Sequence, residues 1–455
     1  MIKKIANWWR SQKFKSAIRR GDTRLAVKLL QEIQKSGARF SWLEKLFRDK
    51  LQIERYSQQY KQEAETLSRK LNEELQQQEN RYLDYLTGFK LAQHQEFIDF
   101  VHEHFKLIEH DEHKFQCTGI DERIFDDFEA KLVEYLREEF TRIPDKKLVV
   151  KLQDALEDIN SLKNGKDPDY GFHLTPYVYF MKYFLENVYC VYLAWFFIYQ
   201  ADLLSTKVNI LDIAAGPGTV AYGLALFVQS ISGFLSTLQM DISYYSLEQQ
   251  DAFQFRGLQF WRRYIESRKT PVNAYFRFVT TDILTWNEQS SNIPKDFFDF
   301  IVVSHCFFSD VEKRFQANNI YKQIFASYLK KQGYVLLIVQ DKKLFKIYDT
   351  YQVENHENEK KVVGTLVAEL GLELVWYKYL TSTSLRTPLG GAEFAKFARE
   401  QLPKQLYMSP MIQKYFGQTY ESSYTLDDYV ILAKTSEEFR SQESEFIKVR
   451  YLSSH

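Results

Sequence analysis

The chain has 455 residues, of which 45% are hydrophobic and 16% aromatic, and its 60 Lys and Arg residues balance its 60 Asp and Glu residues. This composition excludes a disordered or collagen-like chain, and the length suggests two or three domains. Three scattered cysteines exclude a disulfide framework and a CxxC metal site. No apolar run approaches the length of a membrane span, and the first residues lack a secretory signal pattern. We therefore expect a cytoplasmic protein without a transmembrane segment.

Residues 1–165 predict an all-α N-terminal domain, because they are poor in glycine and proline and rich in Gln, Glu, Lys, Arg and Leu. Residues 1–50 carry 14 Lys and Arg against four Asp and Glu, and so form a basic arm. Such an arm could bind RNA through its phosphates, bind a protein, lie on a membrane surface, or pack on neighbouring helices by its tryptophans. The sequence leaves these alternatives open.

An apolar stripe with helical spacing runs from Tyr56 to Leu86, inside residues 43–115. It predicts either a coiled-coil hairpin or a long helix that lies on another domain. Five of the nine histidines follow between His94 and His113, but their spacing matches no known zinc site. We expect a solvated, acidic helix end there and assign no metal.

Turn-forming residues at 164–169 predict a linker, and residues 166–206 predict a buried, aromatic-rich helical lead-in. From residue 207 to 440, short β-branched or aromatic runs alternate with helical patterns, which is typical of a parallel sheet with helices on both faces. The segment 384–427 separates the last two runs and is interpreted as an insertion. The predicted strands are 208–213, 235–240, 275–281, 298–304, 334–340, 372–381 and 428–434, with helices after the first five.

One strand–turn–helix segment predicts a site for a nucleotide-type ligand. The predicted strand 208–213 leads into a turn that contains Gly216, Pro217 and Gly218, and a helix follows. Glycine lets the backbone turn sharply beside a ligand, and ligands of open α/β sheets bind at the carboxyl ends of strands. The segment satisfies the GxGxxG/A dinucleotide pattern, and Asp241 lies 20 residues after its last position. An NAD-dependent oxidoreductase is therefore one alternative.

Acidic residues at three predicted strand ends favour a different cofactor. Asp212 ends the first strand, Asp241 follows the second and Asp282 follows the third. Together with the glycine turn, this pattern resembles that of the class I S-adenosylmethionine-dependent methyltransferases, over residues 207–435. The resemblance implies an α/β fold with a Rossmann-like seven-stranded methyltransferase sheet, whose last strand is antiparallel, after the all-α domain.

The same resemblance implies a role for each matching residue. Asp212 would act through the loop and the amino group of S-adenosylmethionine, Asp241 would accept hydrogen bonds from the ribose hydroxyls, and Asp282 would face the adenine amino group. Ala214 stands where the family has its first glycine, and an alanine there predicts a negative φ. The other positions expected beside the cofactor are Gly216, Pro217, Gly218, Ile242, Ile283 and Ser304.

The end of the fourth predicted strand, where the family binds the transferred methyl group, reads Ser304-His305-Cys306. His305 could be a general base, or it could only anchor its loop by hydrogen bonds. Cys306 is interpreted as a small buried thiol and not as a nucleophile. The segment lacks the Asn/Asp-Pro-Pro-aromatic motif of the enzymes that methylate amino groups of nucleic acids.

We therefore predict an S-adenosylmethionine-dependent methyltransferase. The accessory helical domain and its basic arm favour a macromolecular substrate, RNA or protein, over a metabolite. One alternative is a catalytically inactive methyltransferase-like protein that serves in binding or assembly, and a further alternative is the NAD-dependent oxidoreductase.

Overall fold

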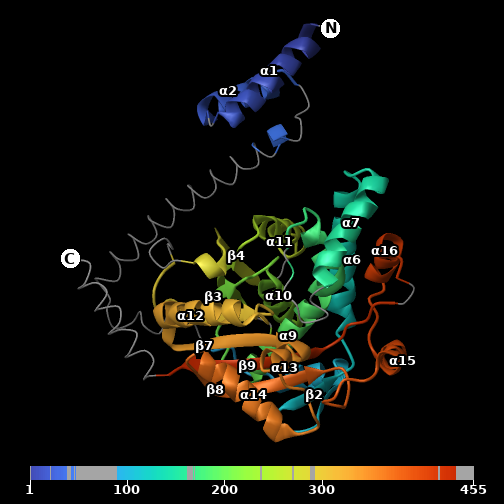
Figure 1. Cartoon of the computed structure of the whole chain (residues 1–455), viewed down its shortest axis with the longest axis vertical. Coiled ribbons are helices and arrows are strands. Elements are labelled where there is room, and N and C mark those ends of the chain that lie inside the picture. Colours follow the sequence, from blue (N-terminus) through green and yellow to red (C-terminus); the bar gives the residue numbers. More distant parts are fainter. Residues whose placement is uncertain are drawn as a thin grey trace, which may run out of the picture. The chain divides into compact units, whose positions relative to one another are not determined.

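The computed structural model describes residues 2–20, 22–37, 43–45, 47, 90–160, 168, 170–235, 238–268, 271–286, 293–418 and 421–436. The chain divides into two compact units, residues 1–86 and 87–455 (Figure 1). The domain boundary predicted near residue 165 therefore lies inside the second unit. The apolar stripe that suggested a coiled coil, and most of the predicted linker, lie outside the described residues.

The first unit contains a helical hairpin of α1 (Ile2–Arg19) and α2 (Thr23–Lys35). The two helices meet through buried apolar side chains, among them Phe14 of α1 and Leu29 of α2. Asp22 caps α2 by accepting a hydrogen bond from the main-chain N–H of Leu25 (3.0 Å). Each helix ends two residues before a glycine of the sequence, Gly21 after α1 and Gly37 after α2.

The second unit is built on one nine-stranded sheet with the order β1-β2-β8-β9-β7-β6-β3-β4-β5. The last strand, β9, is antiparallel to both its neighbours, and β3 to β7 are parallel, which is the predicted Rossmann-like arrangement. The strands are β1 (Leu107–Glu109), β2 (Lys114–Cys117), β3 (Lys207–Ile213), β4 (Met240–Glu248), β5 (Val272–Thr280), β6 (Phe298–Ser304), β7 (Leu329–Gln340), β8 (Leu372–Thr381) and β9 (Asp427–Thr435).

Two strands more than the predicted seven are present, because β1 and β2 extend the sheet beyond β8. They form an antiparallel hairpin, and β2 pairs in parallel with β8 through Phe115 and Leu380. The prediction of helix alone over residues 1–165 is therefore wrong for 107–117. These strands have only three and four residues, and their pairing with a distant strand stabilises them where local sequence gives no signal.

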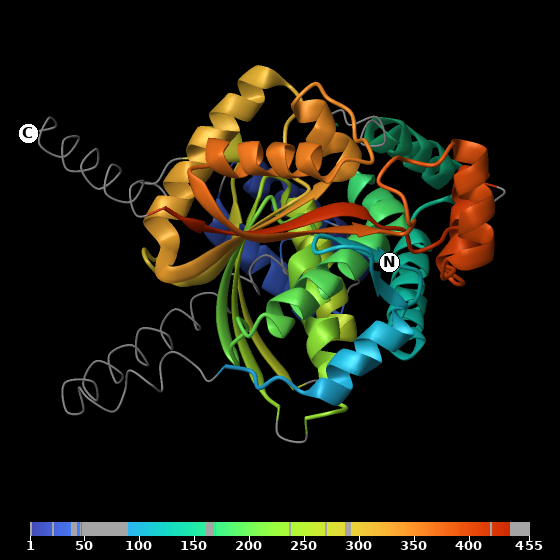
Figure 2. The same cartoon turned by 90° about the horizontal axis from the view of Figure 1, so that it is seen from below.

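Helices cover both faces of the sheet (Figure 2). Alternate strand residues face opposite sides, so Ile210 packs with α9 and α10 while the next residue, Leu211, packs with α12 and α14. The helices of this unit are α5 (Gln95–His104), α6 (Glu122–Phe140), α7 (Asp145–Ile159), α8 (Thr175–Tyr179), α9 (Leu185–Gln200), α10 (Thr219–Ile231), α11 (Asp251–Tyr264), α12 (Val311–Tyr328), α13 (Asp341–Ile347), α14 (His356–Glu369), α15 (Gly391–Gln401) and α16 (Met408–Phe416), with a π-helical turn, η2, at Phe180–Phe184.

Four of the seven predicted strands lie within one residue of where the sequence places them, β7 begins five residues earlier than predicted, and β5 begins three residues earlier and ends one residue earlier. The exception is the second, predicted at 235–240, which forms β4 at Met240–Glu248. The helix expected after the third predicted strand is also not found in the described part of that connection, which contains only the 3-10 turn η3 (Ile283–Thr285).

The helical lead-in is buried, as predicted, and it packs closely on the sheet domain. Helix α9 lies against α10, where a Cβ on Gly223 would come within 2.5 Å of Val191 Cγ1. Gly223 thus belongs to a helix–helix contact and not to the ligand turn. Among the residues that the structure describes, no helix combines the length and the apolar character needed to cross a membrane.

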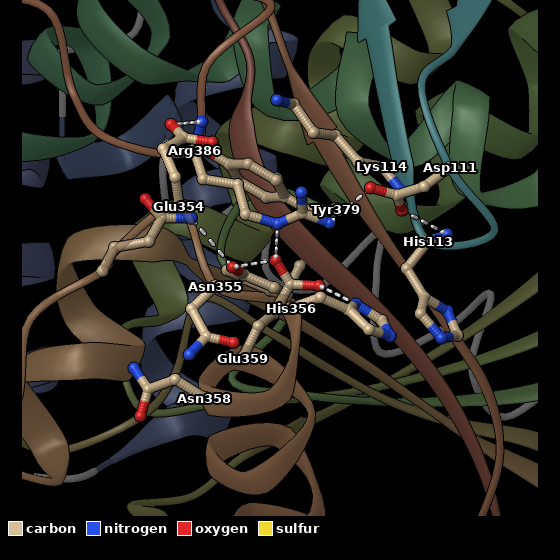
Figure 3. Close-up of polar contacts among 12 residues, drawn as sticks. Asp111, His113, Lys114, Glu354, Asn355, His356, Asn358, Glu359, Tyr379 and Arg386 are labelled. Carbon is tan, nitrogen blue, oxygen red and sulfur yellow. Dashed lines mark hydrogen bonds and ion pairs between the residues drawn. The ribbon is translucent and has the colours of Figure 1, made fainter.

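The start of the insertion 384–427 is fixed by a buried ionic cluster around Arg386 (Figure 3). The Arg386 guanidinium donates from Nε to Glu359 of α14 (2.8 Å) and from Nη2 to Asp111 of the β1–β2 turn (2.7 Å). His113 stacks on Tyr377 of β8, with ring centroids 4.0 Å apart. This Arg386 cluster joins the added hairpin, α14 and the insertion at the edge of the sheet remote from β5.

Candidate functional site

A cavity of about 390 Å³ opens at the carboxyl ends of β3, β4, β5, β6 and β7. Its walls come from the turns that follow these strands, from the lead-in helices, and from the first turns of α12 and α13. The connections after β3 and β6 lead to helices on opposite faces of the sheet, α10 and α12, and such a switch point leaves a crevice in which open α/β sheets bind ligands. The cavity is therefore the candidate site.

The predicted glycine turn forms one wall of this cavity. Gly216 and Gly218 have φ values of +54° and +85°, a backbone region that glycine adopts at no steric cost. Ala214 also has a positive φ, +55°, so the prediction of a negative φ is wrong; the turn imposes the glycine-like conformation on alanine. Ala214 and Gly216 line the cavity, whereas Pro217 and Gly218 do not lie among its lining residues.

Helix α11 supports the turn from behind. A Cβ on Gly257 would lie 2.0 Å from the carbonyl oxygen of Pro217, so only a glycine lets the helix approach this closely. The hydroxyl of Tyr222 on α10 donates to the carbonyl of Gly257 (2.8 Å) and so joins the two helices. Gly257 has no signal of this role in the sequence, where it is one glycine within an otherwise ordinary helical pattern.

Asp212 ends β3 below the glycine turn and lines the cavity, with only 1% of its surface exposed. Its Oδ2 accepts a hydrogen bond from the hydroxyl of Tyr244, and its Oδ1 has no hydrogen-bond partner among the described residues. Burial raises the pKa of this carboxyl to about 8. An unpartnered buried carboxyl oxygen is unfavourable, and a ligand cation or N–H donor would satisfy it.

Glu248, which the sequence analysis missed, provides the second acid. It ends β4 and accepts hydrogen bonds from the main-chain N–H of Gly216 to Oε2 (2.8 Å) and of Gln250 to Oε1 (2.9 Å). Burial raises the pKa of Glu248. The signal in the sequence is an uncharged run, 242–247, that has an acid at each end.

Asp241, the residue expected in that role, lies at the other end of β4. It pairs with Lys207 at the start of β3, is exposed, and accepts a hydrogen bond from Asn273 Nδ2 (3.1 Å). Ile242 beside it is buried among the core residues. Neither residue lines the cavity, because β4 runs eight residues beyond the predicted strand end.

Asp282 and Ile283 follow β5, and both line the cavity. Asp282 begins η3 and accepts a hydrogen bond from the main-chain N–H of Leu284 (2.9 Å), which fixes one carboxylate oxygen. Ile283 is 8% exposed and offers an apolar surface. Three carboxylates therefore stand at the ends of three neighbouring strands, β3, β4 and β5.

Ser304 and His305 lie on the other side of the cavity, at the end of β6. His305 has a φ of +60°, and its main-chain N–H donates to Ile338 of β7 (2.8 Å). Its Nδ1 is 2.9 Å from Ser304 Oγ, and its Nε2 is 3.0 Å from Asp428 Oδ1 on β9. Cys306 follows, and its carbonyl accepts from the hydroxyl of Tyr321 (2.8 Å).

The five histidines between His94 and His113 do not come together. His110 bonds to Gln116 (2.9 Å), while His113 belongs to the Arg386 cluster. Within the described ranges, no three His, Cys, Asp or Glu side chains are grouped as a metal ion would require.

No protein-family model and no curated protein matches this chain. Solved structures with a similar arrangement include an S-adenosylmethionine-dependent methyltransferase from Methanosarcina mazei (16% identity, TM-score 0.30), which covers 52% of this chain and 97% of that one. A coclaurine N-methyltransferase bound to N-methylheliamine and S-adenosylhomocysteine covers 68% and 95%, with 11% identity and a TM-score of 0.31. A loganic acid methyltransferase with S-adenosylhomocysteine covers 56% and 93%, with 10% identity and a TM-score of 0.29.

The charges of the cavity suit a cationic ligand at the glycine turn. The part of the cavity beside the glycine turn is lined by Asp212, Glu248 and Asp282. The lysines that line the cavity, Lys313 and Lys343, come from α12 and α13. The unpartnered Oδ1 of Asp212 fits an ammonium group, and carboxylates accept paired hydroxyl or N–H donors. A diphosphate at the turn would instead face two carboxylates.

Proposed function

We propose that this chain is an S-adenosylmethionine-dependent methyltransferase. The observation that carries the proposal is the set of three carboxylates at the ends of β3, β4 and β5, one of them the buried Asp212 with an unpartnered oxygen. S-Adenosylmethionine carries an ammonium group, two ribose hydroxyls and an adenine amino group, so each acid has a donor to bind. The same acids disfavour the NAD-dependent alternative, because a diphosphate would lie beside Asp212 and Glu248.

In this proposal each acid at a strand end binds one part of the cofactor. Asp212 holds the ammonium group, Glu248 the ribose hydroxyls and Asp282 the adenine amino group, while Ile283 packs on the base. Ala214 and Gly216 leave room for the ligand beside the turn. When bound, the cofactor supplies an activated methyl group for an in-line displacement, and the protein contributes alignment of the acceptor and exclusion of water.

We propose a macromolecular acceptor, RNA or protein, for this activity. The support is the first unit, where Arg24, Lys28 and Lys35 are exposed on α2. These residues lie opposite the buried residues of α2, such as Leu29, and form one cationic stripe. Because the apolar side of α2 is buried, this helix has no apolar face left for a membrane surface.

Calorimetric titration with S-adenosylmethionine tests the cofactor assignment. We expect binding by the wild type, a loss of at least about tenfold in affinity for Glu248→Gln because hydrogen bonds to a charged group are lost, and no change for Asp241→Asn. Equal effects of the two substitutions would refute the placement of the site. Binding of NAD without binding of S-adenosylmethionine would refute the methyltransferase.

A salt series tests the acceptor class. If the cationic stripe binds RNA, retention on RNA should fall steeply with salt and weaken in an Arg24→Gln, Lys28→Gln, Lys35→Gln triple variant, since each contact releases counterions. If retention on RNA depended on neither the salt concentration nor the triple substitution, RNA binding by the first unit would be excluded.

A further inference from the structure

Ser304, His305 and Asp428 form a continuous hydrogen-bonded row from the cavity to the sheet. Ser304 and His305 end β6 and line the cavity, whereas Asp428 belongs to β9, more than 120 residues later. Ser304 Oγ and Asp428 Oδ1 lie 2.9 Å and 3.0 Å from the two ring nitrogens of His305. The antiparallel strand β9 begins at the edge where β6 and β7 end, which brings the three residues together.

The partners of His305 fix which ring nitrogen carries the proton. A carboxylate can only accept hydrogen bonds, so the Nε2 that faces Asp428 must be the protonated one. In the neutral ring Nδ1 then has a free lone pair, and it accepts the hydroxyl hydrogen of Ser304. Asp428 is itself held by the main-chain N–H of Asp427, which donates to its Oδ2 (3.3 Å).

This arrangement leaves the lone pairs of Ser304 Oγ as acceptors toward the cavity, because its hydrogen is directed at His305. We propose that Ser304, His305 and Asp428 form a proton relay for an acceptor hydroxyl, with Asp428 as the positioning residue. The inference rests on the proposed methyltransferase function and deepens it by naming the chemical group that is methylated.

The proton balance of the relay is simple. The acceptor hydroxyl gives its proton to Ser304 Oγ, and the former Ser304 proton moves to His305 Nδ1. The acceptor oxygen keeps the electron pair with which it bonds to the methyl carbon, while the methyl–sulfur bond breaks and its electron pair would stay on the sulfur of the departing S-adenosylhomocysteine. His305 becomes an imidazolium whose Nε2–H remains bonded to Asp428, and it later releases one proton to water. An acceptor that is already ionised would need none of these groups.

The backbone of His305 supports a functional arrangement. A positive φ is unfavourable for a histidine, and such conformations persist where the surrounding structure over-determines them, often at active sites. Here the N–H···O bond to Ile338 continues the pairing of β6 with β7 and holds the backbone in that state. The ring is thereby placed between Ser304 and Asp428.

The tautomer of His305 can be measured on the whole protein by NMR with ¹⁵N-labelled histidine. Long-range correlations at pH 7, assigned by their loss in His305→Gln, should show Nε2–H and an unprotonated Nδ1. Asp428→Asn should yield a mixture of tautomers, and Ser304→Ala should shift the Nδ1 resonance because its hydrogen-bond donor is lost. A wild-type Nδ1–H tautomer, or an unchanged spectrum in Asp428→Asn, would overturn the relay.

Two further measurements separate this inference from the proposed function. Asp428→Asn should bind S-adenosylmethionine as the wild type does in calorimetry, and should lower kcat about 100-fold when release of S-adenosylhomocysteine is followed. An unchanged kcat would overturn the relay while leaving the methyltransferase intact. Failure of the wild type to bind S-adenosylmethionine would refute the methyltransferase itself, whatever the tautomer.

Discussion

The stability of the Asp212→Asn variant relative to the wild type should rise from pH 5 to pH 7, and the variant should bind the cofactor less tightly. Asp212 is 1% exposed, and burial raises the pKa of its carboxyl from 3.8 to about 8. Between pH 5 and pH 7 the carboxyl is ionised in the unfolded chain, whereas in the folded protein it keeps its proton. Unfolding therefore releases nearly one proton, and raising the pH favours the unfolded state throughout this window.

The size of the effect follows from that proton. One proton corresponds to about 1.4 kcal/mol per pH unit, so the wild type should lose about 2.5 kcal/mol of stability through Asp212 between pH 5 and pH 7. Asparagine releases no proton, and its side-chain oxygen can still accept the hydrogen bond from Tyr244. The stability advantage of the variant should thus grow by about 2.5 kcal/mol over the same two pH units.

Urea unfolding at pH 5, 6 and 7, followed by tryptophan fluorescence, measures this difference. Asp241→Asn is the matched control, because Asp241 is an exposed aspartate at the other end of the sheet, and its difference from the wild type should be flat. A flat difference for Asp212→Asn would mean that this carboxyl is ionised in the folded protein, and would refute the reasoning. In calorimetry on the same samples, the affinity for S-adenosylmethionine should be reduced in Asp212→Asn and unchanged in Asp241→Asn.

Three other substitutions test the supports of the site and the sheet. Gly257→Ala should cost about 1–3 kcal/mol in urea unfolding because its Cβ would collide with the glycine turn, whereas Gly364→Ala, with open space around it, should gain about 0.5–1 kcal/mol; similar values for the two would contradict the close approach. Arg386→Met should cost about 3–5 kcal/mol because it leaves the buried carboxylate of Glu359 without its cation, against less than about 0.5 kcal/mol for the exposed Arg399→Met. Ala214→Gly should not lower the free energy of unfolding and should raise it by up to about 1 kcal/mol, since alanine is strained at positive φ.

The sequence predicts most strands of the central sheet because their signal is local. The run 298–304, for example, is mostly apolar and contains three consecutive β-branched residues, and β6 has the same limits. The hairpin of β1 and β2 has no comparable pattern. Its strands are stabilised by pairing with β8 and by the bond between Asp111 and Arg386, which lies 275 positions away in the chain. Contacts of that range leave no periodicity in the local sequence.

The misplaced second strand shows how one element can move a functional residue. Residues 235–240 are apolar enough to suggest a strand, but the paired segment is Met240–Glu248, whose centre is Ser243-Tyr244-Tyr245-Ser246. Because the predicted strand ends just before Asp241, this exposed residue became the expected ligand of the ribose, and Glu248 received no role. Both residues are acids that flank the same strand, so composition could not separate them. The register of β4 against β3 separates the two acids, because only Glu248 reaches the glycine turn.

Backbone strain gives an independent indication that the cavity is the functional site. Seven non-glycine residues of the described chain have a positive φ, and three of them, Tyr170, Ala214 and His305, line this one cavity. Each lies in a different segment: the lead-in, the turn after β3 and the turn after β6. Local strain of this kind is unfavourable for folding and is retained where side chains must be held in a fixed arrangement. Under the proposed function, strained backbone at both the glycine turn and the end of β6 would help to hold the cofactor and the acceptor in line with one another.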